Sequence, residues 1–408
     1  DLQASTASLL AGDFAALPVD QLAQLLHHAD RRVRFEAQWE LVDRGAFSAL
    51  KEVALAQPSN QVDGGERLAE LSRLHAIWGL GMLLPQHLDV AALSILLKDN
   101  NPRVRAALLS ILRGQLESLQ LDASGKAPII MALRDPDLKV RFQAAYLVGE
   151  MRSPGDDMKI LAALDEKSVG DRFVLHAVSR GLAAAMPETT LVTFTGNPNR
   201  NHRLAAVLAL RWQGSTLLSR FLADSDPLIA AEAACAIYDL NLTAAWPQLA
   251  SMLPQHQKLP RSMVRRALAA CQQLGQPQHA QMIFDFVHSE GVDEELLKEA
   301  REYIINWDRP QEFDPILNEF RSYGERASDW FYDKQLDFPT AAVLDAVDRG
   351  RAVFAENLIT GCTKCHSLHG VTPAGVLNPA GPELSSIGNK YSPADIRKSI
   401  LEPAAMIA

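Results

Sequence analysis

The sequence predicts an all-α protein with an array of stacked helical hairpins over residues 1–310, a linker over 311–340 and a small domain over 341–408. Three observations predict this organisation. A basic residue with Ala three positions later recurs at intervals of about thirty residues. Aromatic residues make up only 6% of the 408 residues, which is low for a β-sandwich or a propeller. A Cys-x-x-Cys-His motif marks the small domain.

The recurring pattern defines the predicted array. Its clearest copies begin at Arg34, Arg73, Arg141, Arg203 and Arg266, and weaker copies lie at Arg105, Arg172 and Ala230. An interval of this length fits one helical hairpin per repeat. Apolar residues within a copy follow helical spacing, as at Val33, Ala37 and Leu41. Such a helix cannot bury its apolar stripe alone, so we expect it to pack on the next repeat.

Two repeats begin with Asp-x-x-Val-Arg, at residues 30–34 and 137–141. This entry resembles the HEAT-repeat family, and the resemblance covers residues 15–310. It implies an α-solenoid that serves as a scaffold or a binding surface. We expect each repeated Arg to form an ion pair or a cap inside the array. Trp39 and Trp78 occupy similar places in successive repeats, so we expect both indoles to pack in the core.

Composition excludes several classes of protein. Forty basic and forty-nine acidic side chains give a net charge of −9, which argues against a general nucleic-acid binder. No apolar run approaches the roughly 18–20 residues that cross a bilayer, so no transmembrane segment is expected. Four cysteines are too few for a disulfide scaffold. Cys235 and Cys271 lie in apolar helical runs and are expected to be small buried hydrophobes.

Cys362, Cys365 and His366 form the decisive motif of the small domain. Two thiols one short turn apart can add to the two vinyl groups of haem, and the adjacent imidazole can then bind the iron as proximal ligand. Two alternatives stay open. A zinc site could use the same three residues with His369, although typical sites bring ligand pairs from separate segments. A thioredoxin-like dithiol would need a βαβ context, which the sequence does not indicate. We predict one covalent haem c.

The stretch 348–408 resembles a class I cytochrome c domain. More closely, it resembles the haem-binding Cys-x-x-Cys-His module of multidomain proteins from planctomycetes and verrucomicrobia. In those proteins a propeller resembling sugar dehydrogenases precedes HEAT repeats and the cytochrome. The matching residues are Gly350, Phe354, 362–366, 381–384, 387–388, 399–403 and 407–408. The resemblance implies that Pro382 orients His366 through its carbonyl, and that Leu384 and Ile387 pack on the haem face.

The sixth ligand of the haem iron stays open. Met406 is a candidate distal ligand, because it lies at a distance from His366 that a small cytochrome c can use. In the resembling family a distal Met and a closing helix follow later in the chain. We therefore expect the domain to be truncated, and a Met beyond residue 408, a water or a vacant position are the other candidates. His/Met ligation raises the potential, whereas an open position permits small-ligand binding.

These features lead to a functional expectation of one-electron transfer. The haem would relay electrons between an oxidoreductase, a fused or partner propeller dehydrogenase, and another redox carrier, with the array as docking scaffold. Covalent haem c is attached outside the cytoplasmic membrane, so a periplasmic location is expected. The sequence carries no catalytic constellation, which leaves enzymatic activity of its own undecided. The alternative is an interaction scaffold whose haem is a structural staple or a gas or redox sensor.

Overall fold

The structure is a computed structural model. It describes residues 2–56, 65–84, 94–118, 121–153, 155–168, 170–307, 310, 312–321, 323, 384, 387, 391, 395 and 396. Within these residues the chain is mostly helical, which confirms the predicted all-α class, and one two-stranded hairpin is the only sheet. No helix in this part of the chain is both long enough and apolar enough to cross a membrane. The chain divides into two compact units, residues 1–236 and 237–408.

The first unit consists of helices joined by short turns. Its α-helices are α1 (Leu2–Ala11), α2 (Val19–Leu25), α3 (Arg31–Asp43), α4 (Phe47–Leu55), α5 (Gly65–Leu83), α7 (Pro102–Gly114), α8 (Ala123–Met131), α9 (Leu138–Met151), α10 (Arg172–Ala185), α11 (Glu188–Leu191) and α12 (Arg200–Gln213). Its 3-10 helices are η1 (Phe14–Ala16), η2 (Leu116–Ser118), η3 (Ala132–Arg134), η4 (Asp157–Ala163), η5 (Val192–Gly196) and η6 (Thr216–Phe221). Helix α13 (Pro227–Asp239) begins in the first unit and ends in the second.

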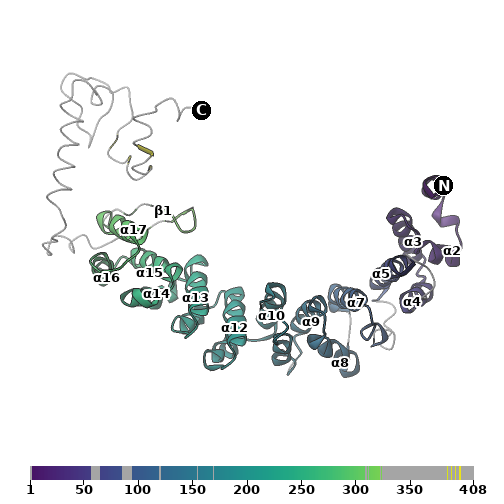
Figure 1. Ribbon diagram of the computed structural model, residues 1–408, viewed down its shortest axis with the longest axis horizontal. Coiled ribbons are helices and arrows are strands. Elements are labelled where there is room, and N and C mark those ends of the chain that lie inside the picture. Colours follow the sequence, from purple (N-terminus) through teal and green to yellow (C-terminus); the bar gives the residue numbers. More distant parts are fainter. Residues whose placement is uncertain are drawn as a thin grey trace, which may run out of the picture. The chain divides into compact units, whose positions relative to one another are not determined.

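Helices α3, α5, α7, α9, α10 and α12 pack in chain order, each on the next (Figure 1). We call these six helices the helix row. The intervening helices cover the row, as α4 packs on α5, α8 on α9, and η4 on both α9 and α10. The core lies between the two sets of helices. Val33, Ala37 and Leu41 of α3 are fully buried there, as their helical spacing predicts.

A recurring turn starts several helices of the first unit. In this turn, the side chain of a first Asp or Asn accepts a hydrogen bond from the backbone N–H of a second Asp or Asn, which lies two residues later in the chain. The side chain of this second residue then caps the N-terminus of the helix. The pairs are Asp99 with Asn101, Asp135 with Asp137, Asn197 with Asn199, and Asp224 with Asp226. Each pair satisfies donors that a helix N-terminus leaves unpaired. These four turns are therefore helix starts.

In four helices of the row, α5, α7, α9 and α12, the repeated Arg forms an ion pair with an Asp that follows the helix, as expected. Arg105 of α7 binds Asp135 with two hydrogen bonds, Nε to Oδ2 at 2.8 Å and Nη2 to Oδ1 at 2.6 Å. The other pairs of this kind are Arg73 with Asp99, Arg141 with Asp165, and Arg203 with Asp224. Arg34 instead donates to the carbonyls of His28 and Ala29 in the turn before its own helix.

Arg172 is not a copy of this Arg, although the sequence predicts one there. The repeated Arg lies four residues after the helix cap, as in Asp137 and Arg141. In α10 the cap is Asp171, so the equivalent position is Leu175. Arg172 is instead exposed, and its guanidinium carbon lies 5.1 Å from the ring centre of Phe173. The prediction was wrong by three residues, because it aligned basic residues without fixing the cap.

Two glycines let α9 and α10 approach closely. A Cβ added to Gly149 would lie 2.2 Å from the Cα of Gly181, and one added to Gly181 would lie 2.6 Å from the carbonyl oxygen of Ala145. Neither contact is possible for a real side chain. The backbones of these two helices therefore touch at this crossing, and only glycine fits on either side.

The second unit contains the end of α13 and a shorter set of helices. They are η7 (Thr243–Ala245), α14 (Trp246–Ala250), η8 (Leu253–Lys258), α15 (Arg261–Leu274), α16 (Pro277–Val287) and α17 (Glu294–Ile305). Helix α15 packs on α14, α16 and α17. A hairpin follows, in which β1 (Phe313–Asp314) pairs antiparallel with β2 (Glu319–Phe320).

A buried polar cluster anchors the hairpin to the second unit. The Tyr238 hydroxyl donates to Asp314 Oδ2 at 2.6 Å, and Arg321 Nη1 lies 3.4 Å from the same oxygen. The guanidinium of Arg321 also lies 4.9 Å from the Tyr238 ring centre. Burial and the adjacent carboxylate raise the pKa of Tyr238. The start of the predicted linker is thus a docked hairpin.

Candidate functional site

Most residues of the predicted haem site lie outside the described residues. These are Cys362, Cys365, His366, Pro382 and Met406, as well as His369 of the alternative zinc site. Leu384 and Ile387 are described, and both are half-buried. The backbone N–H of Ile387 donates to the carbonyl of Leu384 at 3.0 Å, and that of Tyr391 donates to Ile387 at 3.1 Å.

The donor set of the motif suits a covalently attached haem. Two thiols separated by two residues match the two vinyl groups, and one imidazole supplies a nitrogen ligand for iron. Elsewhere in the described part of the chain, no three His, Cys, Asp or Glu side chains come together in a way that would hold a metal ion. The motif therefore remains the candidate metal centre on the chemistry of its own residues.

Of the two cysteines outside the motif that were expected to be buried, Cys271 is buried and Cys235 is only half-buried. Cys271 of α15 is fully buried, and its thiol lies 3.9 Å from the carbonyl oxygen of Ala250. Burial raises the pKa of this thiol to about 12, so it stays protonated at neutral pH. Cys235 of α13 is half-buried. The environment of Cys271 does not produce the thiolate that reactive or metal-binding cysteines need.

His75 is a packing residue. Its Nδ1 lies 2.7 Å from Oε1 of Gln38, and its ring meets Phe35 edge to face with centres 4.9 Å apart. Burial lowers its pKa to about 4, with the charge of Arg34 as a smaller contribution. The imidazole is therefore neutral at pH 7 and joins α3 to α5 through Gln38.

The exposed tryptophans contradict the expectation of core packing. Trp39 is 50% exposed and Trp78 is 47% exposed, and Trp212 of α12 is 50% exposed as well. Successive residues of an α-helix are about 100° apart, so Trp39 points about 200° away from the buried Ala37. The sequence contained this signal. Two side chains at equivalent positions of successive repeats lie on the same side of the helix row, but this equivalence does not tell whether that side is buried. Here it faces solvent.

Aromatic rings and guanidinium groups form a continuous cluster on this exposed face of the helix row. Tyr146 of α9 and His176 of α10 have ring centres 6.1 Å apart, and His176 meets Trp212 edge to face at 5.7 Å. Arg113 lies 4.5 Å from the ring centre of Tyr146, and Arg180 lies 4.4 Å from that of Trp212. Each contact is in the range of a cation–π interaction. The cluster links four helices: α7, α9, α10 and α12.

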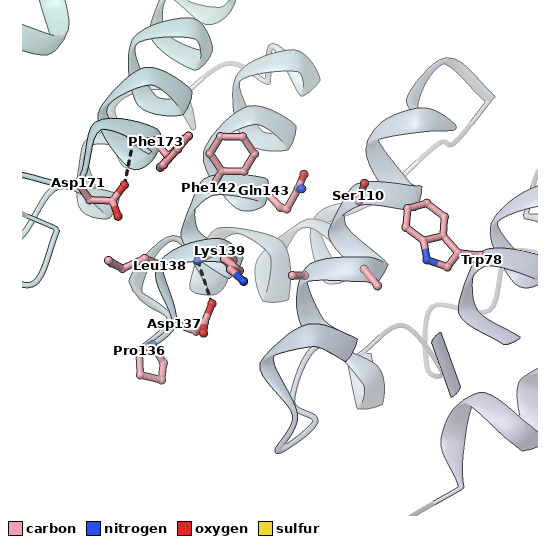
Figure 2. Close-up of a pocket in the computed structure, with 12 residues that line it drawn as sticks. Trp78, Ser110, Pro136, Asp137, Leu138, Lys139, Phe142, Gln143, Asp171 and Phe173 are labelled. Atoms are coloured by element: carbon pink, nitrogen blue, oxygen red, sulfur yellow. Dashed lines mark hydrogen bonds between the residues drawn. The ribbon is translucent and has the colours of Figure 1, made fainter. Parts of the chain in front are cut away.

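An open groove of about 860 Å³ lies on the same row, across α5, α7, α9 and α10 (Figure 2). Trp78 lies at one end, and Phe142 and Phe173 lie together at the other. Between them α7 contributes only the small residues Ala106, Ala107 and Ser110, so the middle of the groove is hollow. Lys139 and Gln143 of α9 add polar groups to its lining. The sequence did not indicate this groove, because its walls come from four separate repeats.

Comparison with known proteins gives no independent assignment. Neither protein-family models nor curated protein sequences match the chain. The site and its function therefore rest on the residues themselves.

Proposed function

We propose that this chain transfers single electrons through one haem c attached at Cys362 and Cys365, between an oxidoreductase and another redox carrier. The single observation that carries the proposal is the Cys-x-x-Cys-His motif at 362–366. The donor and acceptor partners are a fused or separate dehydrogenase and a second carrier protein. Attachment of haem c outside the cytoplasmic membrane places the protein in the periplasm.

Each residue of the motif has a defined task in this proposal. The thiols of Cys362 and Cys365 hold the cofactor covalently, which lets a small domain retain it without a deep pocket. The imidazole of His366 is the proximal ligand, and the Pro382 carbonyl fixes the orientation of that ring. Leu384 and Ile387 shield the cofactor from water, which tunes its potential. The bound haem supplies the one-electron chemistry, so no acid, base or nucleophile of this chain is required.

We also propose that residues 1–310 form a HEAT-like solenoid that serves as docking scaffold. The ordered packing of the helix row within the first unit, the recurring capped turns and the Arg–Asp pairs support this architecture. An alternative role is a scaffold in which the haem is a staple or sensor. The exposed aromatic face of the helix row favours a binding role for the scaffold, which is compatible with both readings.

The decisive experiment is a visible spectrum of the chain produced with cytochrome c maturation machinery, followed by a pyridine haemochrome assay. Sharp α and β bands with haem retained after denaturation are expected. The Cys362→Ala/Cys365→Ala double variant is expected to lose covalent haem, whereas Cys235→Ala/Cys271→Ala retains it. A colourless protein containing zinc would exclude electron transfer. Spectral change under CO, without reversible reduction at a partner's potential, would favour the sensor.

A further inference from the structure

Four helices of the helix row carry far more basic than acidic side chains. Helices α7, α9, α10 and α12 contain ten basic side chains and one acidic side chain, Glu150. The chain as a whole has a net charge of −9. These basic side chains lie on the same helices that display the aromatic cluster and most of the groove.

Three of these ten cations have no carboxylate partner among the described residues. The seven paired ones are Arg103, Arg105, Arg113, Arg141, Arg200, Arg203 and Arg211, which contact acidic groups of neighbouring turns or helices. Lys139, Arg172 and Arg180 remain, and all three are exposed. Arg172 and Arg180 lie against the rings of Phe173 and Trp212, which orients their guanidinium groups while leaving the N–H edges free.

The acidic groups nearest the groove are already engaged. Asp137 accepts the backbone N–H groups of Lys139 and Val140, and Asp171 accepts those of Phe173 and Val174. These carboxylates cap α9 and α10, where the helix dipole compensates their charge. Lys139, Arg172 and Arg180 are therefore the charged side chains of this surface that stay available to pair with a partner.

The exposed aromatic side chains of the groove indicate that a partner also needs large apolar side chains. Trp78 and Phe173, at opposite ends of the groove, are 47% and 59% exposed. Packed helices lie roughly 8–10 Å apart, so a groove from α5 to α10 accommodates about eight residues of extended peptide. The small side chains of Ala106 and Ser110 leave room for a bulky apolar side chain between the aromatic ends. Contiguous exposed apolar surface rimmed by charge is typical of protein interaction sites.

We propose that this face of the helix row binds an acidic peptide segment with large apolar side chains. Its apolar residues fill the groove between Trp78 and Phe142, and its carboxylates pair with Lys139, Arg172 and Arg180. A nucleic acid could also use cations and aromatic rings, but the net charge of −9 repels a polyanion over long range. A short acidic segment brings few charges and apolar side chains that suit the groove.

The test is fluorescence anisotropy of the full chain with a labelled synthetic peptide of about ten residues in which Asp or Glu alternates with Leu or Phe. A second peptide replaces each acid by Asn or Gln, and a labelled oligothymidine is the third probe. We expect the acidic peptide to bind at least about tenfold more tightly than the amide peptide, with an affinity that falls as salt is added. Equal binding of both peptides, or tighter binding of the oligothymidine, overturns the proposal.

Variants locate the binding surface. Lys139→Glu/Arg172→Glu/Arg180→Glu and, separately, Trp78→Ala are each expected to weaken binding of the acidic peptide by about tenfold or more. Arg220→Glu and Met131→Ala are matched controls, because both side chains are exposed outside the groove and the aromatic cluster. They are expected to bind like the unmodified chain. Circular dichroism melting confirms that each variant is folded. Folded surface variants that bind as tightly as the unmodified chain, or no binding at about 1 mM, overturn the assignment.

Discussion

Arg105 and Asp135 form a two-pronged ion pair between successive helices of the row, 30 residues apart in sequence. Their side chains are only 10% and 9% exposed. Asp135 also accepts the backbone N–H of Asp137, and Arg105 Nη1 donates to the carbonyl of Asp99 at 2.6 Å. This pair thus joins one repeat to the helix start of the next. The charges of Arg105 and Asp135 compensate each other, and further hydrogen bonds satisfy both groups despite their burial.

Arg105→Ala is expected to lower the free energy of unfolding by about 2–4 kcal/mol, because it leaves the buried carboxylate of Asp135 without its partner. The measurement is urea unfolding followed by circular dichroism. The double variant Arg105→Met/Asp135→Leu is expected to lose less free energy of unfolding than the sum of the losses in its two single variants, because it leaves no unpaired charge buried. Arg32→Ala, which affects an exposed pair with Asp30, serves as control and is expected to leave the midpoint unchanged. Equal losses for Arg105→Ala and Arg32→Ala would contradict the structural role.

Gly149→Ala is expected to destabilise the first unit by about 1–3 kcal/mol, because the added methyl group collides with the backbone of Gly181 and must separate α9 from α10. Thermal unfolding measures the effect. Gly114→Ala, at the end of α7, is the matched control, since no atom lies within 4 Å of its added Cβ. That control is expected to be neutral or slightly stabilising. A Gly149→Ala protein as stable as the unmodified chain would show that the two backbones are farther apart.

Stability is expected to fall between pH 6.5 and pH 4 in part through His75. Its pKa is lowered from 6.5 to about 4 in the folded chain, so the unfolded state takes up a proton first as the pH falls. The contribution of neutral His75 to the free energy of unfolding is fully present above pH 6.5, the pKa in the unfolded chain. It is lost as the pH falls towards about 4, the pKa in the folded chain. Comparing the urea midpoints of the unmodified chain and His75→Gln across this range measures it. A pH dependence that is identical in the two proteins would contradict the assignment.

Thiol alkylation separates the four cysteines. In native protein Cys271 is expected to resist iodoacetamide, because its pKa is about 12 and its side chain is buried. After denaturation, haem-loaded protein is expected to take two labels, at Cys235 and Cys271, since thioethers block the other two thiols. Mass spectrometry of the intact chain counts the labels. Four labels on denatured, matured protein would exclude covalent attachment.

The sequence predicts the local features of this protein better than the contacts between its repeats. The helical class follows from spacing and residue chemistry within one repeat, and so does the expectation that the repeated Arg forms an ion pair or a cap. The partner of each Arg lies 20–30 residues away and came from the structure. The motif at 362–366 likewise identifies its candidate chemistry by sequence alone, because all its donors lie within five residues. The roles of Leu384 and Ile387, like those of the other residues of that site, stay predictions.

Only the tertiary structure decided how the exposed helix faces combine. Helical spacing places Trp39 on the face opposite Ala37, but the packing of each helix on the next is what joins exposed side chains of successive helices into the aromatic cluster and the groove. The same holds for Gly149 and Gly181, which are distant in sequence and touch only because α9 and α10 cross there. Local patterns are determined by backbone geometry and side-chain chemistry within a few residues. Contacts between repeats depend on how whole helices share their surfaces, and this information is distributed over the entire unit.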